Sequence, residues 1–439
     1  MLMLLIQVAI MAFFVIYGLK AGGAMGVGIF SMLALFVMIF VFKLPPGGIP
    51  WTAIIIILSI AIAGGLLEAS GGLDYLVYQA GRLIQAKPEA ITFVAPLVVF
   101  FFVFGVGTAN IALALEPVIA RTALRARVRP ERPLVATVTA ANMGLLASPA
   151  ASSALTAIAL LGGHNFTIGQ YMAIVLPSGV IATIALSVFM CFVGKKLTDE
   201  PKYQELLKEG KLEVNVGNAQ EKPVFTKNQI LSVAVFMGAI ACILTLGLYA
   251  PLLHAITAPL ANGKYIPSAQ IVIIFMFMAA GGIMFLTKIS PNAVFKTKIF
   301  TAAVAAAVAV LGPGWLGATI FNAPENAAVL KESLGHIIQA YPWITVVICG
   351  IVATFVMSQT AIITIVYPLA LGLGVPAPFL AAMIQAVNVN YFIPAQPTLL
   401  FAEEIDITGT TQKYRFWLPG VFSLIVSIAA GLLIWKLFL

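Results

Sequence analysis

The chain has 439 residues, of which 61% are hydrophobic and only 9% are charged, and its mean hydropathy is +1.06. Soluble domains carry about 25% charged residues, so this composition excludes a soluble protein and indicates an integral membrane protein. The formal net charge of +8 is concentrated in a few loops, which favours a role in membrane orientation over nucleic-acid binding.

The first half begins with three apolar stretches, near residues 3–19, 24–42 and 52–69. Each is close to the roughly 20 residues that a helix needs to cross a bilayer. The first stretch lacks the basic leader and cleavage site of a secretory signal, so we expect it to be retained as a span. Such lengths, without the roughly ten-residue alternation of barrel strands, exclude an outer-membrane barrel.

An octet that occurs twice follows in each half of the chain. GRLIQAKP at 81–88 and GHIIQAYP at 335–342 share five of eight residues. After each octet, an apolar run is interrupted by a short polar cluster, GTAN at 107–110 and SQT at 358–360. Three pairs of prolines then keep the same order, namely Pro117 and Pro368, Pro133 and Pro378, and Pro149 and Pro394. We therefore interpret the halves as structural repeats.

Each half offers five crossing helices and one interrupted stretch, which we interpret as a re-entrant hairpin. Two short crossings in place of each hairpin would give the same charge distribution, but 109–120 is too short to span. Because five is odd, the second half is inverted. The expected fold is an all-α polytopic membrane protein with two inverted repeats of five transmembrane helices plus one re-entrant hairpin each, and with broken helices at the midplane.

These features predict the boundaries of the two repeats. The first covers 1–194, with a hairpin at about 89–120 and a broken helix at about 133–161, and a cytoplasmic linker follows at 195–228. The second covers 229–439, with a hairpin at about 343–374 and a broken helix at about 378–402. Basic residues gather in 121–132, 195–227 and 288–298, so these loops are predicted to be cytoplasmic and both termini periplasmic.

The two hairpin tips and two helix breaks are the candidate binding site. Irregular backbone inside a bilayer occurs only where protein or a water-filled cavity satisfies it. Ser148 before Pro149 predicts an N-cap for a new half-helix. Up to four half-helix N-termini could converge there, each with about half a positive charge, and no Lys or Arg lies in a predicted span core. This pattern is typical of a secondary transporter and favours a small carboxylate as substrate.

The predicted substrate-binding residues are the polar side chains of these interruptions: Thr108, Asn110, Ser148, Ser152, Ser153, Ser358, Gln359, Thr360, Gln396 and Thr398. Three nearby amides, Asn142, Asn388 and Asn390, are open to a second interpretation as hydrogen bonds between helices. Glu116 has two open interpretations: a proton-carrying or coupling group, or an ion-pair partner for an arginine of the 121–132 loop.

Four stretches resemble one known family, the anaerobic C4-dicarboxylate transporter (Dcu) family of the ion-transporter superfamily. They are SGGLDYLVYQAGRLI (70–84), GTANIALALEPVIA (107–120), RPLVATVTAANMGLLASP (132–149) and DITGTT (406–411). The resemblance implies an inner-membrane carrier of fumarate, succinate, malate or aspartate, working by exchange as an elevator-type homodimer. It implies small dicarboxylate anions and the lipid bilayer as partners, and no nucleic acid.

Several alternatives stay open on the sequence alone. A sodium/proton antiporter or another organic-anion carrier of the same superfamily fits the same pattern, and Na⁺ or H⁺ could couple to transport. A channel is a third class. We expect no enzymatic activity, cofactor or bound metal, because the sequence contains no nucleotide loop, metal-ligand cluster or nucleophile paired with a base.

Overall fold

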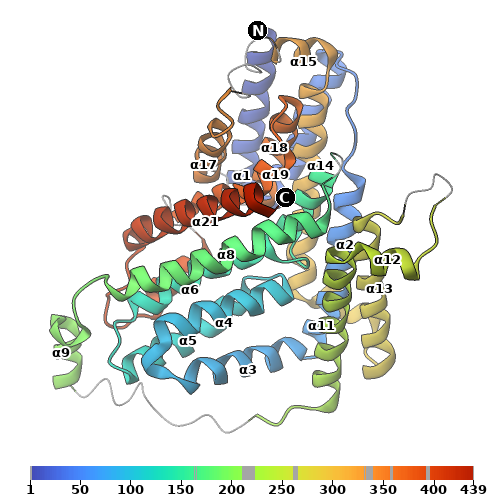
Figure 1. Ribbon diagram of the computed structural model, residues 1–439. Coiled ribbons are helices and arrows are strands. Elements are labelled where there is room, and N and C mark those ends of the chain that lie inside the picture. Colours follow the sequence, from blue (N-terminus) through green and yellow to red (C-terminus); the bar gives the residue numbers. More distant parts are fainter. Residues whose placement is uncertain are drawn as a thin grey trace.

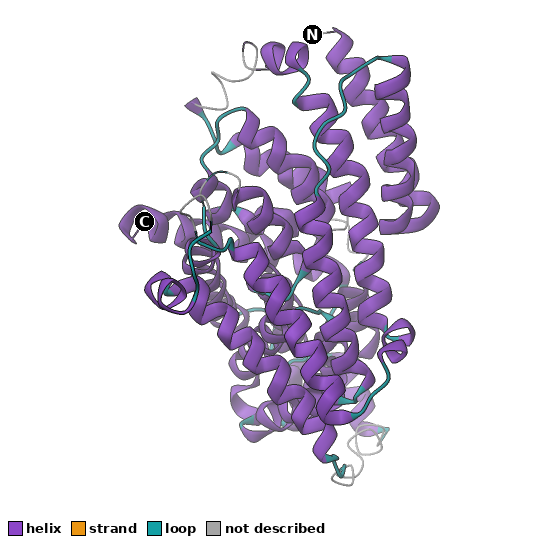
Figure 2. Ribbon diagram, turned by 90° about the vertical axis from the view of Figure 1, so that its right-hand side faces the viewer, coloured by secondary structure: helices purple, strands orange, loops and turns teal. Residues whose placement is uncertain are grey.

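The computed structural model describes residues 2–162, 164, 166–209, 223–260, 265–330, 332, 340–355, 359–391 and 396–438. Within these ranges the protein consists of helices and connecting loops, with no strand (Figure 2). Eight helical stretches in this part are long and apolar enough to cross a membrane. They are Trp51–Ala69, Pro88–Val106, Glu131–Gly162, Ile168–Cys191, Lys227–Leu248, Ala269–Thr287, Lys298–Phe321 and Lys413–Leu437. The predicted all-helical, multi-pass membrane architecture is confirmed at this level.

The first group of helices runs along the long direction of Figure 1. It comprises α1 (Leu2–Phe36), α2 (Trp51–Ala69), α11 (Lys227–Leu248), α13 (Ser268–Thr287) and α14 (Lys298–Phe321), with the short α12 (Ala250–Ile256). In this group α1 packs on α14, α14 on α2, α2 on α13 and α13 on α11. We call these helices the frame.

Helix α1 is bent back on itself between the two predicted spans. Gly22 and Gly23 have non-helical backbone angles, and φ of Gly23 is +56°, which favours glycine. The two arms then pack so closely that a Cβ on Gly18 would lie 2.5 Å from the carbonyl oxygen of Gly26. Small residues permit such close approach of membrane helices.

The second group of helices, which we call the bundle, contains the segments with the predicted interruptions. Most of these helices run across the view of Figure 1. From the first half it contains α3 (Gly72–Ala86), α4 (Ile91–Val106), α5 (Asn110–Arg125), α6 (Glu131–Ala147), α7 (Ser152–Gly162) and α8 (Ile168–Cys191). From the second half it contains α17 (Ile344–Phe355), α18 (Gln359–Gly372), α19 (Ala377–Ala382), α20 (Pro397–Ile405) and α21 (Trp417–Phe438).

The frame and the bundle meet along a few helices. In that interface α14 packs on α18 and α2 packs on α7, while α11 contacts both α3 and α8. Among the described residues, two short α-helices lie outside both groups, α9 (Pro201–Lys208) in the linker and α15 (Pro324–Leu330) after α14. The bundle therefore brings segments from both halves of the chain against one side of the frame.

The interruptions in the first half occur where the sequence predicts them, with one correction. Helix α4 ends at Val106, Gly107 adopts φ +75°, and α5 begins at Asn110. Helix α6 ends at Ala147, but α7 begins at Ser152 and not at Pro149. Ser148 is therefore not the N-cap of α7, because that helix begins four residues later; its hydroxyl donates to the carbonyl of Phe104 on α4 at 2.6 Å and accepts from the N–H of Ala150 at 3.0 Å. Ser148 instead ends α6 with an extended backbone.

The broken helix of the second half is less regular than predicted. A 3₁₀ segment, Ile384–Tyr391, follows α19, and Asn388 and Val389 have non-helical angles within it. Helix α20 then begins at Pro397. Pro394, Ser358 and the first five residues of the second octet, 335–339, lie outside the described residues.

Candidate functional site

Four helices begin at the predicted interruptions, and a chain of contacts links their first turns. They are α5 at Asn110, α7 at Ser152, α18 at Gln359 and α20 at Pro397. Two of them come from each half of the chain. The free N–H groups and the partial positive charge of helix N-termini make such a meeting point suitable for an anion.

The first tip packs directly on the first helix break. A Cβ on Gly107 would lie 2.3 Å from the carbonyl oxygen of Ala150, so only glycine permits this approach. Thr108 accepts a hydrogen bond from the N–H of Asn110 at 3.3 Å, which orders the start of α5. The hydroxyl of Ser148 accepts from the N–H of Ala150 at 3.0 Å and ties the break to α4. This part of the site is rigidly held.

The two halves meet where α7 and α18 begin. The hydroxyl oxygens of Ser152 and Thr360 lie 3.3 Å apart, within hydrogen-bonding distance. Thr364, one turn further along α18, donates to the carbonyl of Thr360 at 2.7 Å. Two predicted site residues that are 208 positions apart in the sequence are therefore neighbours.

A cluster of five amide side chains continues from this contact, and we call it the amide cluster. Its members are Asn142, Gln359, Gln385, Asn388 and Gln396. Asn142, inside α6, and Gln396, the N-cap of α20, form two reciprocal hydrogen bonds of 2.9 and 3.0 Å. The amide nitrogen of Gln359 donates to the backbone carbonyl of Asn142 at 3.3 Å and to the side-chain oxygen of Asn388.

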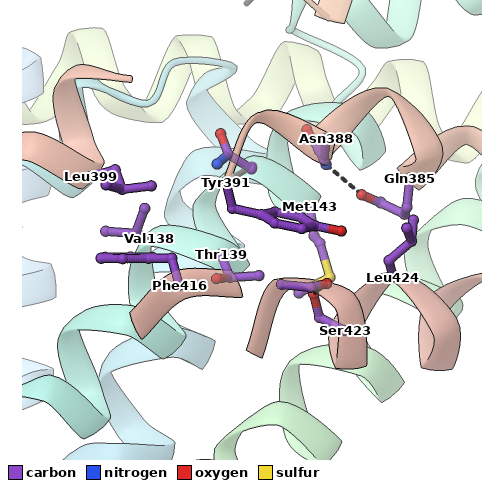
Figure 3. A pocket seen from close by; sticks show the side chains of 12 residues that line it. Val138, Thr139, Met143, Gln385, Asn388, Tyr391, Leu399, Phe416, Ser423 and Leu424 are labelled. Carbon is purple, nitrogen blue, oxygen red and sulfur yellow. Dashed lines mark hydrogen bonds between the residues drawn. The ribbon is translucent and has the colours of Figure 1, made fainter. Parts of the chain in front are cut away.

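The amide cluster ends beside a small cavity of about 20 Å³. Asn388 donates to the side-chain oxygen of Gln385 at 2.6 Å, and Figure 3 shows both lining the cavity together with Tyr391 and Met143. The amide nitrogen of Gln385 is buried without a hydrogen-bond partner. A buried donor of this kind is costly unless a water or ligand satisfies it.

A larger cavity, of about 120 Å³, lies between the bundle and the frame. Its polar lining comes from Thr108 and Ser152, which belong to the first tip and the first break. Its opposite wall is formed by small and aliphatic residues of α2 and α14: Ile57, Ile60, Ala61, Gly64, Ile299, Ala302, Ala303 and Ala306. The cavity thus joins two predicted site residues to an apolar wall.

Only some of the predicted site residues lie together in the structure. Thr108, Ser152, Thr360, Gln359 and Gln396 take part in the linked contacts. Ser148 is used in packing the break, Ser153 is buried in the first turn of α7, and Ser358 lies outside the described residues. The hydroxyl of Thr398 is buried without a partner, and Asn110 contributes its backbone N–H.

Sequence reasoning overlooked Gln385 entirely, and it treated Asn142 and Asn388 as open to two interpretations. The sequence does contain a pattern that indicates these residues: Gln385 and Asn388 are two amides three residues apart, just before a predicted break. Side chains at this spacing lie on one face of a helical turn.

Glu116 lies on α5, fully buried, with 0% of its surface exposed. Neither of its carboxylate oxygens has a hydrogen-bond partner. The predicted alternative of an ion pair with an arginine of the 121–132 loop is therefore not found.

A second polar group, which we call the charged cluster, lies where α6 begins and α20 ends. It contains Arg129, Glu131, Glu200, Asp406 and Arg415. The guanidinium of Arg129 bonds the carboxylates of both Glu131 and Glu200, and Arg415 lies 3.6 Å from Glu131. Burial by itself would lower the pKa of Arg129, but hydrogen bonds and attraction from the two glutamates raise it above its usual value.

Asp406 is the first residue of the DITGTT loop, and its carboxylate accepts several hydrogen bonds from that loop. Its carboxylate accepts from the N–H groups of Thr408 and Thr411, at 3.0 and 2.7 Å, and from the hydroxyls of Thr408 and Thr410. The N–H of Glu131 in turn donates to the hydroxyl of Thr410 at 3.4 Å. The loop thereby fastens the end of α20 to the start of α6.

Comparison with known proteins matches the whole chain to one family. The family model described as anaerobic C4-dicarboxylate membrane transporter matches residues 3–439. The anaerobic C4-dicarboxylate transporter DcuB of Escherichia coli O6:H1 is 30% identical over 97% of both chains. The C4-dicarboxylate transporter DcuA of Escherichia coli K12 is 30% identical over 98% of both chains, and that of Wolinella succinogenes is 29% identical over 98% of this chain and 99% of its own. The chain therefore belongs to the DcuA/DcuB family of anaerobic C4-dicarboxylate membrane transporters.

Proposed function

We propose that this protein carries C4-dicarboxylates such as fumarate, succinate, malate or aspartate across the bacterial inner membrane, by exchange of one for another. The observation that carries the proposal is the meeting of four helix N-termini with neutral hydroxyl and amide side chains from both halves. The contacts that join them in the described part of the chain involve no lysine or arginine. Family membership and the names of the relatives support the same substrate class.

Neutral donors suit a carrier better than a fixed positive charge. A dicarboxylate must leave water when it enters the site, and helix N-termini with hydroxyl and amide donors compensate that loss. Because no full positive charge holds the anion, the dianion can also leave again on the other side. One carboxylate would contact Thr108, Ser152 and Thr360, and the other would contact the amide cluster.

The packing of the helices supports two inverted repeats with re-entrant hairpins. The second arm of the first hairpin, α5, packs on α20 of the second half, and the corresponding α18 packs on α7 of the first half. Such an exchange is expected when two halves are related by a two-fold axis in the membrane plane. The first tip lies level with the break before α7, which continues for 11 residues. This level supports a re-entrant hairpin, whose tip must turn within the span.

The transport cycle that we propose moves the bundle against the frame, as in an elevator. The wall that α2 and α14 present to the larger cavity is made of alanine, glycine and isoleucine, so no hydrogen bond must break as Thr108 and Ser152 slide along it. Placement of both termini in the periplasm rests on the basic loops, and assembly as a homodimer rests on the family resemblance.

Counterflow in proteoliposomes tests the proposed function. Vesicles loaded with unlabelled succinate should accumulate labelled succinate, and external fumarate, malate or aspartate should compete while acetate and lactate should not. The account fails if labelled dicarboxylate does not exchange. Exchange of sodium for protons without any dicarboxylate would instead identify an antiporter, and competition by monocarboxylates would identify a broader organic-anion carrier.

A hydroxyl deletion locates the site within the same assay. Thr360→Val removes the partner of Ser152 with little change in side-chain volume, and we expect KM for succinate to rise by about ten- to a hundredfold, because a hydrogen bond to a charged group contributes about 1.5–3 kcal/mol. Thr245→Val on the frame helix α11 is the matched control, since that threonine is exposed and bonds only its own helix. An unchanged KM in Thr360→Val would remove this residue from the site.

A further inference from the structure

Glu116 is a buried acid that the proposed binding contacts do not use. It lies six residues after Asn110, which begins α5, so about 9 Å of helix separates it from the first tip. None of its surface is exposed, and both carboxylate oxygens lack a hydrogen-bond partner. A buried carboxylate without a partner is strongly unfavourable, whereas the neutral acid is much less so.

No cation on the helices around Glu116 forms a hydrogen bond with its carboxylate. Helix α5 packs on α3, α4, α6, α20 and the 3₁₀ turn Pro88–Ala90. The ionisable side chains on these elements and on α5 itself are Asp74, Tyr75, Tyr78, Arg82, Glu89, Arg121, Arg125, Glu131, Arg132, Glu403 and Glu404. None of them donates a hydrogen bond to Glu116. Glu131 is occupied by Arg129 in the charged cluster.

The residue after Glu116 leaves one carbonyl of α5 without its helical donor. Pro117 has no N–H, so the carbonyl of Leu113 lacks its usual helical donor. Side chains on a helix point back toward the preceding turn, which is where that carbonyl lies. A neutral Glu116 can donate its O–H to such a carbonyl, and an ionised Glu116 cannot.

The second half of the chain has a permanent donor at the equivalent position. The prolines that define the repeats, Pro117 and Pro368, pair Glu116 with Tyr367. The hydroxyl of Tyr367 is buried and donates to the carbonyl of Leu380 at 2.8 Å. Equivalent positions of the two hairpins therefore hold different groups. Tyr367 in the second half is a hydroxyl that keeps its proton, whereas Glu116 in the first half is a carboxyl that can lose it.

We propose that Glu116 carries one proton across the membrane together with each dicarboxylate. This inference rests on the proposed function. A bound dianion near the first tip, about 9 Å along α5 from Glu116, disfavours a second negative charge on this side chain in a medium of low dielectric constant, so substrate binding and protonation of Glu116 favour each other. The proton bonds to one carboxylate oxygen from water on the side of entry. It leaves to water on the other side after the substrate is released.

Two assays on the same proteoliposomes separate this proposal from the proposed function. The first is succinate counterflow without a pH gradient, and the second is net uptake of labelled succinate into empty vesicles with the outside acidic. Wild-type protein should show both. Glu116→Gln, which resembles the neutral acid, should retain counterflow while its gradient-driven uptake falls to that of protein-free vesicles. Glu89→Gln makes the same change at an exposed position of the same hairpin and should show both activities.

The outcomes are distinguishable. Gradient-driven accumulation by Glu116→Gln at the wild-type level would overturn the role of Glu116, and so would wild-type protein that exchanges succinate but ignores the pH gradient. Absence of counterflow in wild-type protein would contradict the proposed function instead.

A binding measurement on wild-type protein does not depend on the folding of a variant. Succinate added to purified protein in weakly buffered detergent at alkaline pH, where Glu116 of the empty protein has lost its proton, should cause uptake of one proton per bound molecule, read with a pH-indicator dye. If Glu116→Gln fails to insert, this measurement alone decides. Binding of succinate without proton uptake overturns the proposal.

Discussion

The amide cluster and the charged cluster join the two halves of the chain in different ways. The amide cluster, centred on Asn142 and Gln396, contains no formal charge and keeps one buried donor, on Gln385, without a partner. The charged cluster compensates its buried ions with other ions and with donors from the DITGTT loop. Saturated contacts favour permanent structure, and a neutral, partly unsatisfied network favours reversible binding.

Their positions agree with this division of roles. The amide cluster lies where four helices begin, which is where a substrate would bind and leave. The charged cluster lies at the far ends of α6 and α20, where the guanidinium of Arg129 also holds Glu200 of the linker. If the division is correct, changes in the charged cluster reduce stability, and changes in the amide cluster reduce affinity for substrate.

Removal of Arg129 should have the largest effect on stability. Arg129→Met leaves the fully buried Glu131 with only the more distant Arg415, and breaking a buried ion pair costs about 3 kcal/mol or more. We expect a clear fall in the thermal unfolding midpoint in detergent. Arg121→Met, at an exposed position on α5, should leave the midpoint unchanged. Equal midpoints for both variants would show that the charged cluster does not hold the halves together.

Loss of the reciprocal amide pair should act mainly on transport. Gln396→Ala removes both hydrogen bonds to Asn142 and one donor for a carboxylate, so KM for succinate should rise by about ten- to a hundredfold, as expected for a contact of about 1.5–3 kcal/mol. Asn228→Ala removes an amide bond to the carbonyl of Thr287 in the frame and serves as the control. A fall in unfolding midpoint as large as that of Arg129→Met, with KM unchanged, would reverse the roles assigned to the two clusters.

A single hydroxyl of the DITGTT loop should have the smallest effect. Thr408→Val removes one donor to Asp406 and leaves its other donors in place, so we expect about 1 kcal/mol of destabilisation and no change in KM. Thermal unfolding and counterflow measured on the same preparation check both expectations. A changed KM would place this loop in the transport site.

Much of the architecture could be predicted because it depends on local sequence. Apolar length predicts the spans, and Gly107 and the break after Ala147 follow from glycine, proline and small polar residues that interrupt apolar runs. The starts of α5, α18 and α20 agree with the predicted tips and break. These signals lie within a few residues of the feature that they indicate.

The side-chain partners could not be predicted, because they depend on contacts between segments that are distant in the sequence. Ser148 has the local sequence pattern of an N-cap. Its hydroxyl, however, donates to the carbonyl of Phe104 on another helix, and no sequence spacing predicts that partner. The missing ion pair of Glu116 and the chain from Gln359 to Gln385 likewise arise only when the helices pack. The sequence therefore indicates where the tips and breaks lie, but not which side chains meet there, and Gln385 is missed altogether.

The most direct test asks whether a dicarboxylate occupies the place where the two halves meet. In a background in which the native Cys191, Cys242 and Cys349 are replaced, Thr360→Cys would place a thiol next to Ser152. Succinate or fumarate, at concentrations that saturate exchange, should slow modification of this thiol by a small water-soluble reagent, and acetate should not. We expect protection by dicarboxylates alone; equal rates of modification with and without saturating succinate would show that no dicarboxylate binds where the two halves meet.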